Sequence, residues 1–171
     1  MLIMKKLHRL ILLITTAITI SACGDEGGGA LTCNIPCIDS AVTASPSTID
    51  SASGATVTVS FHLDGNISEV NNVSILLAGS DPLNPVEAIG AGVVLNPTSN
   101  DISVDITVDS GKAAGSYYPF ISVTSNTENT GANYYIDPTK SSSSYTYTEV
   151  LGGISGTAQL SSISIPTITV Q

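Results

Sequence analysis

Apolar and polar residues alternate with a period of two along much of the chain after residue 39. The clearest stretch, 101–109, places Ile or Val at every even position and Asp, Ser or Thr at every odd position. Residues 56–63 alternate in the same way and are followed by the turn residues 64–66. Because successive side chains of a strand point to opposite faces, both stretches are predicted to be half-buried strands.

Further strand-like runs follow at short spacings, separated by turns of Asn, Gly, Pro and Asp. These runs are 72–79, 86–95 (interrupted by glycine), 116–125, 134–137, 144–150 and 160–170. Pro119 cannot donate to a ladder and predicts a bulge or an edge position, and Pro166 predicts another bulge. No helix of normal length is expected after residue 22. The pattern predicts an all-β fold, an antiparallel β-sandwich of about 7–9 strands.

The N-terminal segment has a different pattern, with a basic start followed by the apolar run 10–22. As a helix rising ~1.5 Å per residue, this run reaches about 20 Å, short of the ~30 Å hydrocarbon core of a bilayer. A basic start, a short apolar run and small residues before a boundary are typical of a secretory signal peptide. A signal helix is therefore predicted rather than a membrane span.

The boundary sequence Ile20-Ser21-Ala22-Cys23 resembles the lipobox of bacterial lipoproteins, with Ile where Leu is more frequent. The resemblance implies that Cys23 is the first mature residue and carries a diacylglycerol, with a third acyl chain possible on its amine. Two or three chains hold a protein durably at a membrane. Gly24 resembles the pattern of lipoproteins sent to the outer membrane, on its periplasmic or surface face. The alternative is an ordinary cleaved signal with a chance cysteine.

Three segments follow from these patterns. Residues 1–22 are predicted to be a lipoprotein signal peptide, and 23–38 a lipidated cysteine with a flexible glycine-rich tether. Residues 39–171 are predicted to form one β-sandwich domain, a length sufficient to bury a core.

The mature part of the chain is strongly acidic. It holds all 14 Asp and Glu residues against Lys112 and Lys140, which leaves a net charge of −12. Binding to nucleic acid depends on Lys and Arg neutralising phosphates, so a nucleic-acid partner is excluded. Electrostatic attraction to anionic lipid is excluded as well, so contact with the membrane is assigned to the lipid anchor.

Two cysteines remain if Cys23 is lipidated, and they lie close together as Cys33 and Cys37. In an oxidising compartment they are predicted to form a local disulfide that pins the start of the domain to the tether. Free thiols and a metal pair are the alternatives. The metal pair lacks further ligands, because the mature chain has no other thiol and one histidine. No cofactor and no metal are expected.

Two segments resemble bacterial immunoglobulin-like and fibronectin-like modules, including the adhesion-related CARDB type. Residues 110–128 contain a Gly-x-Tyr before an alternating strand, as in the penultimate strand of these modules, and 54–61 resemble their early strand. The similarity covers roughly 40–125, while 126–171 departs from it through an extended final hairpin or extra strands. The resemblance implies an immunoglobulin-like sandwich with a binding, adhesion or spacing role rather than catalysis.

The acidic residues and the histidine were considered as sites of chemistry. Asp101, Asp105 and Asp109 follow one another at about 13 Å along a strand, too far to share a calcium ion, and are predicted to be a solvated face. Loop acids such as Asp64, Asp81 and Asp137 remain an alternative calcium site. His62 is predicted to be a surface residue, and no hydrolase motif accompanies it. An enzyme is not expected; it would require His62 beside a carboxylate in a cleft.

All six tyrosines fall between residues 117 and 147, among Ser, Thr, Asn and Gly. Such a mixture resembles a binding surface, and the candidates for an exposed patch are Tyr134, Tyr135, Tyr145 and Tyr147. The alternative is cross-strand aromatic pairs with one buried corner tyrosine, most plausibly Tyr117. The leading hypothesis is a lipid-anchored, non-catalytic binding, adhesion or spacer module with a protein or glycan partner in the envelope. The alternative is a carbohydrate- or small-ligand-binding lipoprotein that uses the tyrosine-rich surface.

Overall fold

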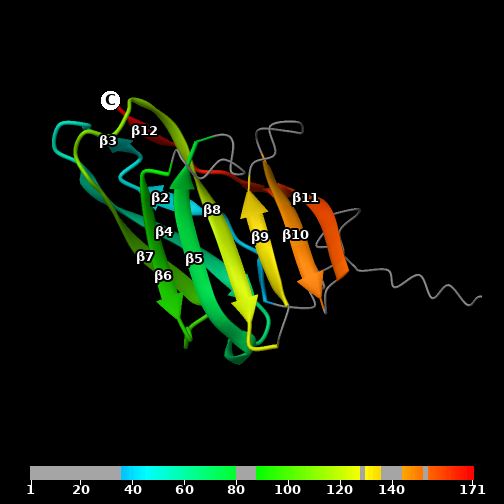
Figure 1. Cartoon of the computed structure of the whole chain (residues 1–171). Coiled ribbons are helices and arrows are strands. Elements are labelled where there is room, and N and C mark those ends of the chain that lie inside the picture. Colours follow the sequence, from blue (N-terminus) through cyan, green and yellow to red (C-terminus); the bar gives the residue numbers. More distant parts are fainter. Residues whose placement is uncertain (1–35, 80–87, 128–129, 136–143, 152–153) are drawn as a thin grey trace, which may run out of the picture.

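The structure is a computed structural model that describes residues 36–79, 88–127, 130–135, 144–151 and 154–171, with the backbone alone at 135, 144–151 and 154–162. Apart from the short 3-10 turn η1 (Ile67–Glu69), the ordered elements of these residues are strands (Figure 1). The strands are β1 (Cys37–Ile38), β2 (Thr43–Ser45), β3 (Thr48–Ile49), β4 (Ala55–Asp64), β5 (Val70–Ala78), β6 (Gly90–Leu95), β7 (Asp101–Val108), β8 (Gly115–Ser125), β9 (Gly131–Tyr135), β10 (Ser144–Leu151), β11 (Ile154–Ser164) and β12 (Ile168–Val170). The predicted signal helix and tether lie outside the described residues, except for 36–38.

The first sheet is built around β4. This strand pairs antiparallel with the full length of β7, from Ala55 opposite Val108 to His62 opposite Asp101. Its other edge pairs with the short strands β2 and β1. Alternate side chains of β4 and β7 are buried, so each strand turns its Val, Ile, Leu and Phe residues inward, as the alternation predicts.

The second sheet is larger and is centred on β8. One edge of β8 pairs with β5, which pairs with β6, and all three strands are antiparallel to their neighbours. The other edge is divided between β12, at residues 115–117, and β9, at residues 121–124. Beyond β9 the sheet continues through β10 to β11, and beyond β12 it ends with the parallel strand β3.

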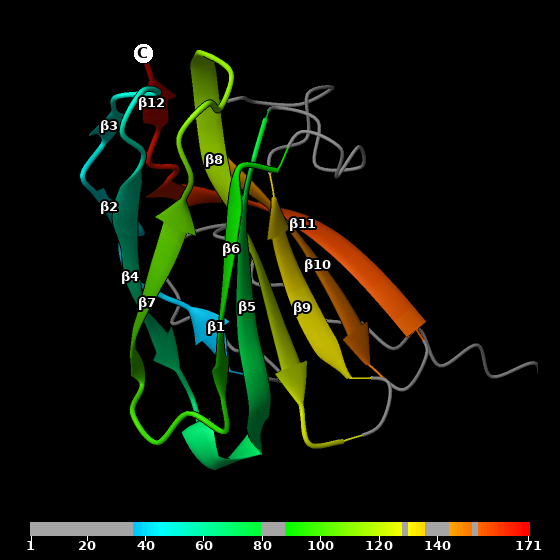
Figure 2. The same ribbon diagram turned by 60° about the vertical axis from the view of Figure 1, so that its left-hand side comes forward.

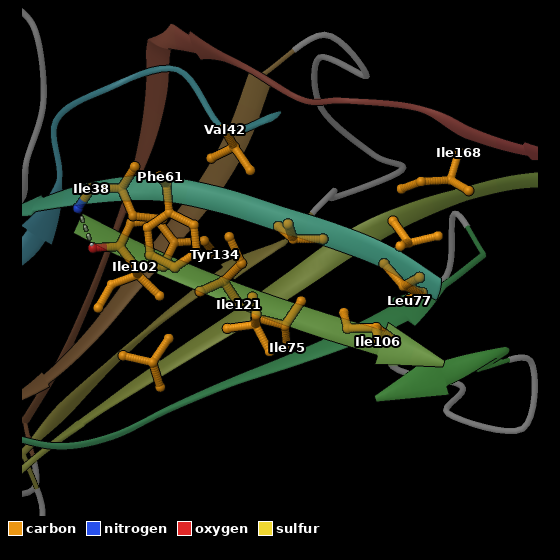
Figure 3. Close-up of a cluster of buried hydrophobic side chains, with 14 of the residues drawn as sticks. Ile38, Val42, Phe61, Ile75, Leu77, Ile102, Ile106, Ile121, Tyr134 and Ile168 are labelled. Atoms are coloured by element: carbon orange, nitrogen blue, oxygen red, sulfur yellow. Dashed lines mark hydrogen bonds between the residues drawn. The ribbon is translucent and has the colours of Figure 1, made fainter. Parts of the chain in front are cut away.

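The two sheets pack face to face around an apolar core (Figure 2). Fully buried side chains come from both layers and are drawn in Figure 3, where Phe61 and Ile102 of the first sheet lie against Ile121 and Tyr134 of the second. Tyr117 lies near the start of β8, is buried, and its hydroxyl donates a hydrogen bond of 3.0 Å to the Ala113 carbonyl. A tyrosine near the start of this strand, bonded to the backbone a few residues upstream, is a hallmark of immunoglobulin-like sandwiches.

The fold class predicted from the sequence is confirmed: the described residues form an all-β sandwich whose strands pair antiparallel, apart from the parallel β12–β3 pair. They contain twelve strands rather than the predicted 7–9. Eight of the described strands have five or more residues, and each lies on or beside a predicted one. The short strands β1, β2 and β3 were not predicted, because two or three residues are too few to show an alternation.

The two prolines act differently from the prediction. Pro119 lies in an interior strand, opposite Leu77 of β5, where the partner on the other side changes from β12 to β9. A residue at this junction needs no ladder donor, so neither a bulge nor an edge strand is required. Pro166 lies between β11 and β12, so the shift in apolar parity marks a change of strand rather than a bulge.

The C-terminal part of the chain adds strands to the second sheet. β9, β10 and β11 stand between β8 and β12 in the sequence and extend the second sheet on the side away from β6 (Figure 1). The final strand β12 then returns to pair with β8, beside β9. The insertion widens one sheet while the strands around β8 keep the arrangement of a sandwich.

Candidate functional site

The outward side chains of β5, β6 and β8 form a surface that we call the uncharged face. None of these three strands contains an acidic or basic residue. The outward positions are Asn72, Ser74, Leu76, Ala91, Val93, Leu95, Ser116, Tyr118, Phe120, Ser122 and Thr124. Residues 23–171 carry a net charge of −12, yet this three-strand surface contains no carboxylate.

A shallow apolar groove of about 400 Å³ lies on the uncharged face, lined by residues of β5, β6 and β8. The strand register explains it, since Leu76 stands opposite Ala91 on one side and Phe120 on the other, which forms an apolar row. In the next row Ser74 stands between Val93 and Ser122. The small serine leaves a hollow that Leu76, Phe120 and Val93 surround.

The groove offers hydrophobic contact and little else. Its lining groups are aliphatic and aromatic carbon, with the Ser74 hydroxyl as the side-chain polar group. Val93 and Leu95 are 55% and 67% exposed, and they are the large hydrophobic residues exposed among those that the structure describes. Such a surface suits burial of an apolar partner group, because exposed apolar patches mark interaction sites.

The outward side of β4 and β7 has the opposite character and is called the acidic face. Asp101 and Asp105 of β7 are exposed there, as is Asp109 just beyond the strand, in agreement with the predicted solvated face. Asp105 Oδ1 accepts a hydrogen bond of 2.6 Å from the Thr58 hydroxyl on β4. This contact ties the Asp105 carboxylate to the neighbouring strand.

His62 lies on the acidic face beside a carboxylate. Its Nδ1 atom is 2.7 Å from Asp39 Oδ1, and its backbone N–H donates to the Ser40 hydroxyl at 2.8 Å. The hydrogen bond with Asp39 raises the pKa of His62 above its ordinary value near 6.5, helped by the charges of Asp39, Asp101 and Asp64 and opposed by desolvation.

The Asp39–His62 pair meets part of the requirement for an enzyme, which was His62 beside a carboxylate in a cleft. The carboxylate is present, and a shallow depression next to His62 is lined by residues such as Ser40, Ser60 and Ser103. The side chain remains 39% exposed. The Ser60 and Ser103 hydroxyls pair with each other at 3.1 Å, and among the described residues no hydroxyl is recorded in a hydrogen bond with the His62 Nε2 atom. A nucleophile aligned with the histidine is therefore not part of the described geometry.

Among the described residues, His, Cys, Asp and Glu form no group of three or more able to hold a metal ion. Of the loop acids, Asp64 lies at the end of β4, where Oδ1 accepts from the Gly65 N–H at 2.8 Å. Asp81 and Asp137 lie outside the described residues.

One of the four tyrosines assigned to the exposed patch lies in the core instead. Tyr134 is fully buried in the core, and its hydroxyl accepts a hydrogen bond of 3.1 Å from the Ile38 N–H (Figure 3). Its assignment to an exposed patch was wrong, because the inward positions of β9 face the apolar core. The side chains of Tyr135, Tyr145 and Tyr147 lie outside the described residues. Their backbones occupy β9 and β10, where Tyr147 stands opposite Tyr134.

Of the three cysteines, Cys37 alone lies in the described part. It is buried in β1, opposite Asp64 of β4, and its sulfur belongs to a disulfide. Cys33, the predicted partner, lies outside the described residues, as does Cys23. The pairing with Cys33 therefore stays a prediction.

Sequence reasoning missed the apolar groove and the Asp39–His62 pair. A signal for the groove exists, since Leu76 breaks the alternation of Val73, Ile75 and Leu77 and makes β5 apolar on both faces. Asp39 and His62 are 23 positions apart and meet because β1 pairs with the end of β4, at Ile38 opposite Leu63. No pattern within either segment indicates that contact.

Comparison of the chain with protein-family models, with curated proteins and with solved structures found no significant match. The part of the chain described by the structure contains no helix with the length and apolar character needed to cross a membrane.

Proposed function

We propose that the chain is a lipid-anchored protein of the cell envelope that binds a protein partner through its uncharged face, without catalysis. The observation that carries the binding role is the apolar groove around Leu76 and Phe120 in an otherwise acidic molecule. Interface cores are depleted in charge and enriched in aromatic residues, which fits this surface better than the acidic face.

The anchor is supported by the order of residues at the N-terminus. A basic start, the short apolar run 10–22 and the lipobox-like Ile20 to Cys23 occur together, and a glycine-rich stretch follows them. A tether of this composition is flexible and allows the sandwich to reach a partner near the membrane surface.

The anchor is tested by mass spectrometry of the native N-terminal peptide. The proposal requires a mature chain that begins at Cys23 and carries acyl chains, and Cys23→Ser should release the protein from the membrane fraction. Ser21→Ala, which keeps a small residue before the cysteine, should remain acylated. An unmodified Cys23 in native envelopes contradicts the anchor.

The binding surface is tested by capture from the native envelope with the anchored chain. The double variant Leu76→Thr/Phe120→Thr places threonine, a residue that favours strands, at both positions. It therefore preserves the strands and removes the apolar row. A partner that contacts the groove should be bound at least about tenfold more weakly, since removal of central apolar anchors commonly costs more than ~1.4 kcal/mol.

Thr107→Ala on the acidic face is the matched control and should capture the partner as well as the wild type does. Thermal unfolding of each variant shows that the sandwich is intact. Equal capture by the double variant and the control, or capture lost only in the control, contradicts binding through the uncharged face.

A further inference from the structure

Strand β6 is an edge of the second sheet without the usual protection against pairing. It forms a ladder with β5 alone among the described strands, and the β5–β6 register runs without a shift from Asn72 opposite Leu95 to Leu77 opposite Gly90. Its sequence, GAGVVL, has no charge and no proline. Sheet edges normally carry charges, prolines or bulges, because unpaired backbone groups otherwise invite another strand.

The neighbouring edge strand β7 shows that this molecule does protect edges elsewhere. β7 carries Asp101 and Asp105, and β6 itself lies against it. A Cβ atom on Gly90 would stand 2.7 Å from the Thr107 carbonyl oxygen, so the β6 backbone covers β7 directly. The exposed edge of the pair is therefore the uncharged one, and its exposed side chains are Val93 and Leu95.

The charge distribution favours a second copy of this chain as the occupant of that edge. Two acidic molecules repel each other wherever their carboxylates approach, and Asp101, Asp105 and Asp64 lie on the strands of the other sheet. Because β5, β6 and β8 carry no charge, contact through β6 brings together strands that add no carboxylate to the interface.

The order of side chains on β6 is self-complementary in an antiparallel pair. With Val93 on the two-fold axis, Ala91 stands opposite Leu95 of the second copy, and Leu95 opposite its Ala91. On the other side of the strand Gly92 stands opposite Val94. Each large residue thus faces a small one, and the same patch serves both molecules, as a two-fold interface requires.

We propose that two copies of the chain associate through β6, antiparallel and centred on Val93, so that their second sheets become one continuous sheet. The dimer is independent of the envelope partner proposed above, because it involves this chain alone. It also places the apolar groove of each copy next to the other, on one side of the joined sheet.

Cysteine cross-linking tests the register. Residues directly opposite in an antiparallel pair have Cα atoms about 4.5–5.5 Å apart, within the ~4.4–6.8 Å that a disulfide spans. In the full chain exported to its own envelope, Val93→Cys should give a dimer on a non-reducing gel that a reductant removes. Ser103→Cys, exposed on the acidic face, is the matched control and should stay at least about tenfold less cross-linked.

A charge at the same position tests the association itself. For the full mature chain purified in detergent, light scattering should give the mass of two chains for the wild type and of one chain for Val93→Lys. Ser103→Lys adds the same charge to the other sheet and should remain dimeric. A monomeric wild type, a dimeric Val93→Lys, or equal cross-linking of Val93→Cys and Ser103→Cys overturns the proposal, whatever the capture experiment gives.

Discussion

At the scale of single residues, Tyr134 makes a polar contact between the two layers of an apolar core. It belongs to β9 of the second sheet, and its hydroxyl accepts the Ile38 N–H from β1 of the first. Both residues are fully buried. A buried backbone N–H needs a partner, so this hydroxyl connects the inserted strands with the start of the domain.

Replacement of Tyr134 by Phe should lower the free energy of unfolding by about 1–3 kcal/mol, because it leaves the buried Ile38 N–H without this acceptor. Chemical denaturation with an unchanged m-value measures the loss. Tyr118→Phe, on the partly exposed side of β8, removes the same atom and should change stability by less than about 0.5 kcal/mol. Equal effects of the two variants would contradict the role assigned to the Tyr134 hydroxyl.

The Asp39–His62 pair makes stability depend on pH. The pKa of His62 is higher in the folded chain than its ordinary value near 6.5, chiefly because Asp39 accepts its hydrogen bond. Protonation therefore favours the folded state. The stabilisation is complete below about pH 6.5 and is lost as the pH rises through the folded-state pKa.

We expect Asp39→Asn to lower the pKa of His62 towards its ordinary value, and the stability difference from wild type to shrink above neutral pH. NMR titration of the ring protons measures the pKa directly, because His62 is the single histidine of residues 23–171. Asp109→Asn, a carboxylate without a recorded effect on His62, is the control. An unchanged pKa in Asp39→Asn would show that the pair does not form.

At the scale of elements, glycine decides how closely β6 approaches the other sheet. A Cβ on Gly92 would stand 2.5 Å from Val104 Cγ1, and one on Gly90 would stand 2.7 Å from the Thr107 carbonyl oxygen. The glycines that interrupt the pattern of 86–95 therefore do not weaken the strand. They let β6 lie on the backbone of β7 and close that side of the sandwich.

Gly90→Ala should lower the free energy of unfolding by about 1–3 kcal/mol, because the neighbouring backbone oxygen cannot move away from the new methyl group. Gly115→Ala in β8 is the matched control. Its Cβ would meet Tyr117 side-chain atoms at 3.7 Å or more, an ordinary contact, so it should be neutral or stabilise by up to about 1 kcal/mol. Thermal and denaturant unfolding check both, and a neutral Gly90→Ala would contradict the close packing of β6 on β7.

Some features of the strands could be predicted from the sequence and others could not. Strict alternation located β4 and β7, since one face of each is buried and the other meets water. The sequence did not predict that the Tyr134 side chain points into the core. β9 (GANYY) carries apolar side chains on both faces, and its pairing with β8 decides which face is buried. The Asp39–His62 contact was equally hidden, since it depends on the register between β1 and β4.

At the scale of the whole molecule, charge and apolar surface are separated between the two sheets. Carboxylates line the outward side of β4 and β7, whereas the apolar groove and the exposed residues of β6 lie on the other layer. Figure 2 shows the backbone of these two layers. The acidic face resists association and the uncharged face permits it. The proposed anchor, partner surface and self-association all follow from this division.

The most direct test of the account is photo-cross-linking in intact cells, with a photoreactive residue placed in the exported full chain at Phe120 or at Thr107. Both positions lie in paired strands, Phe120 on the uncharged face and Thr107 on the acidic face. The account predicts a discrete cross-linked protein partner from position 120 and none from 107. The same partner from both positions, or a partner from position 107 alone, would contradict binding through the uncharged face.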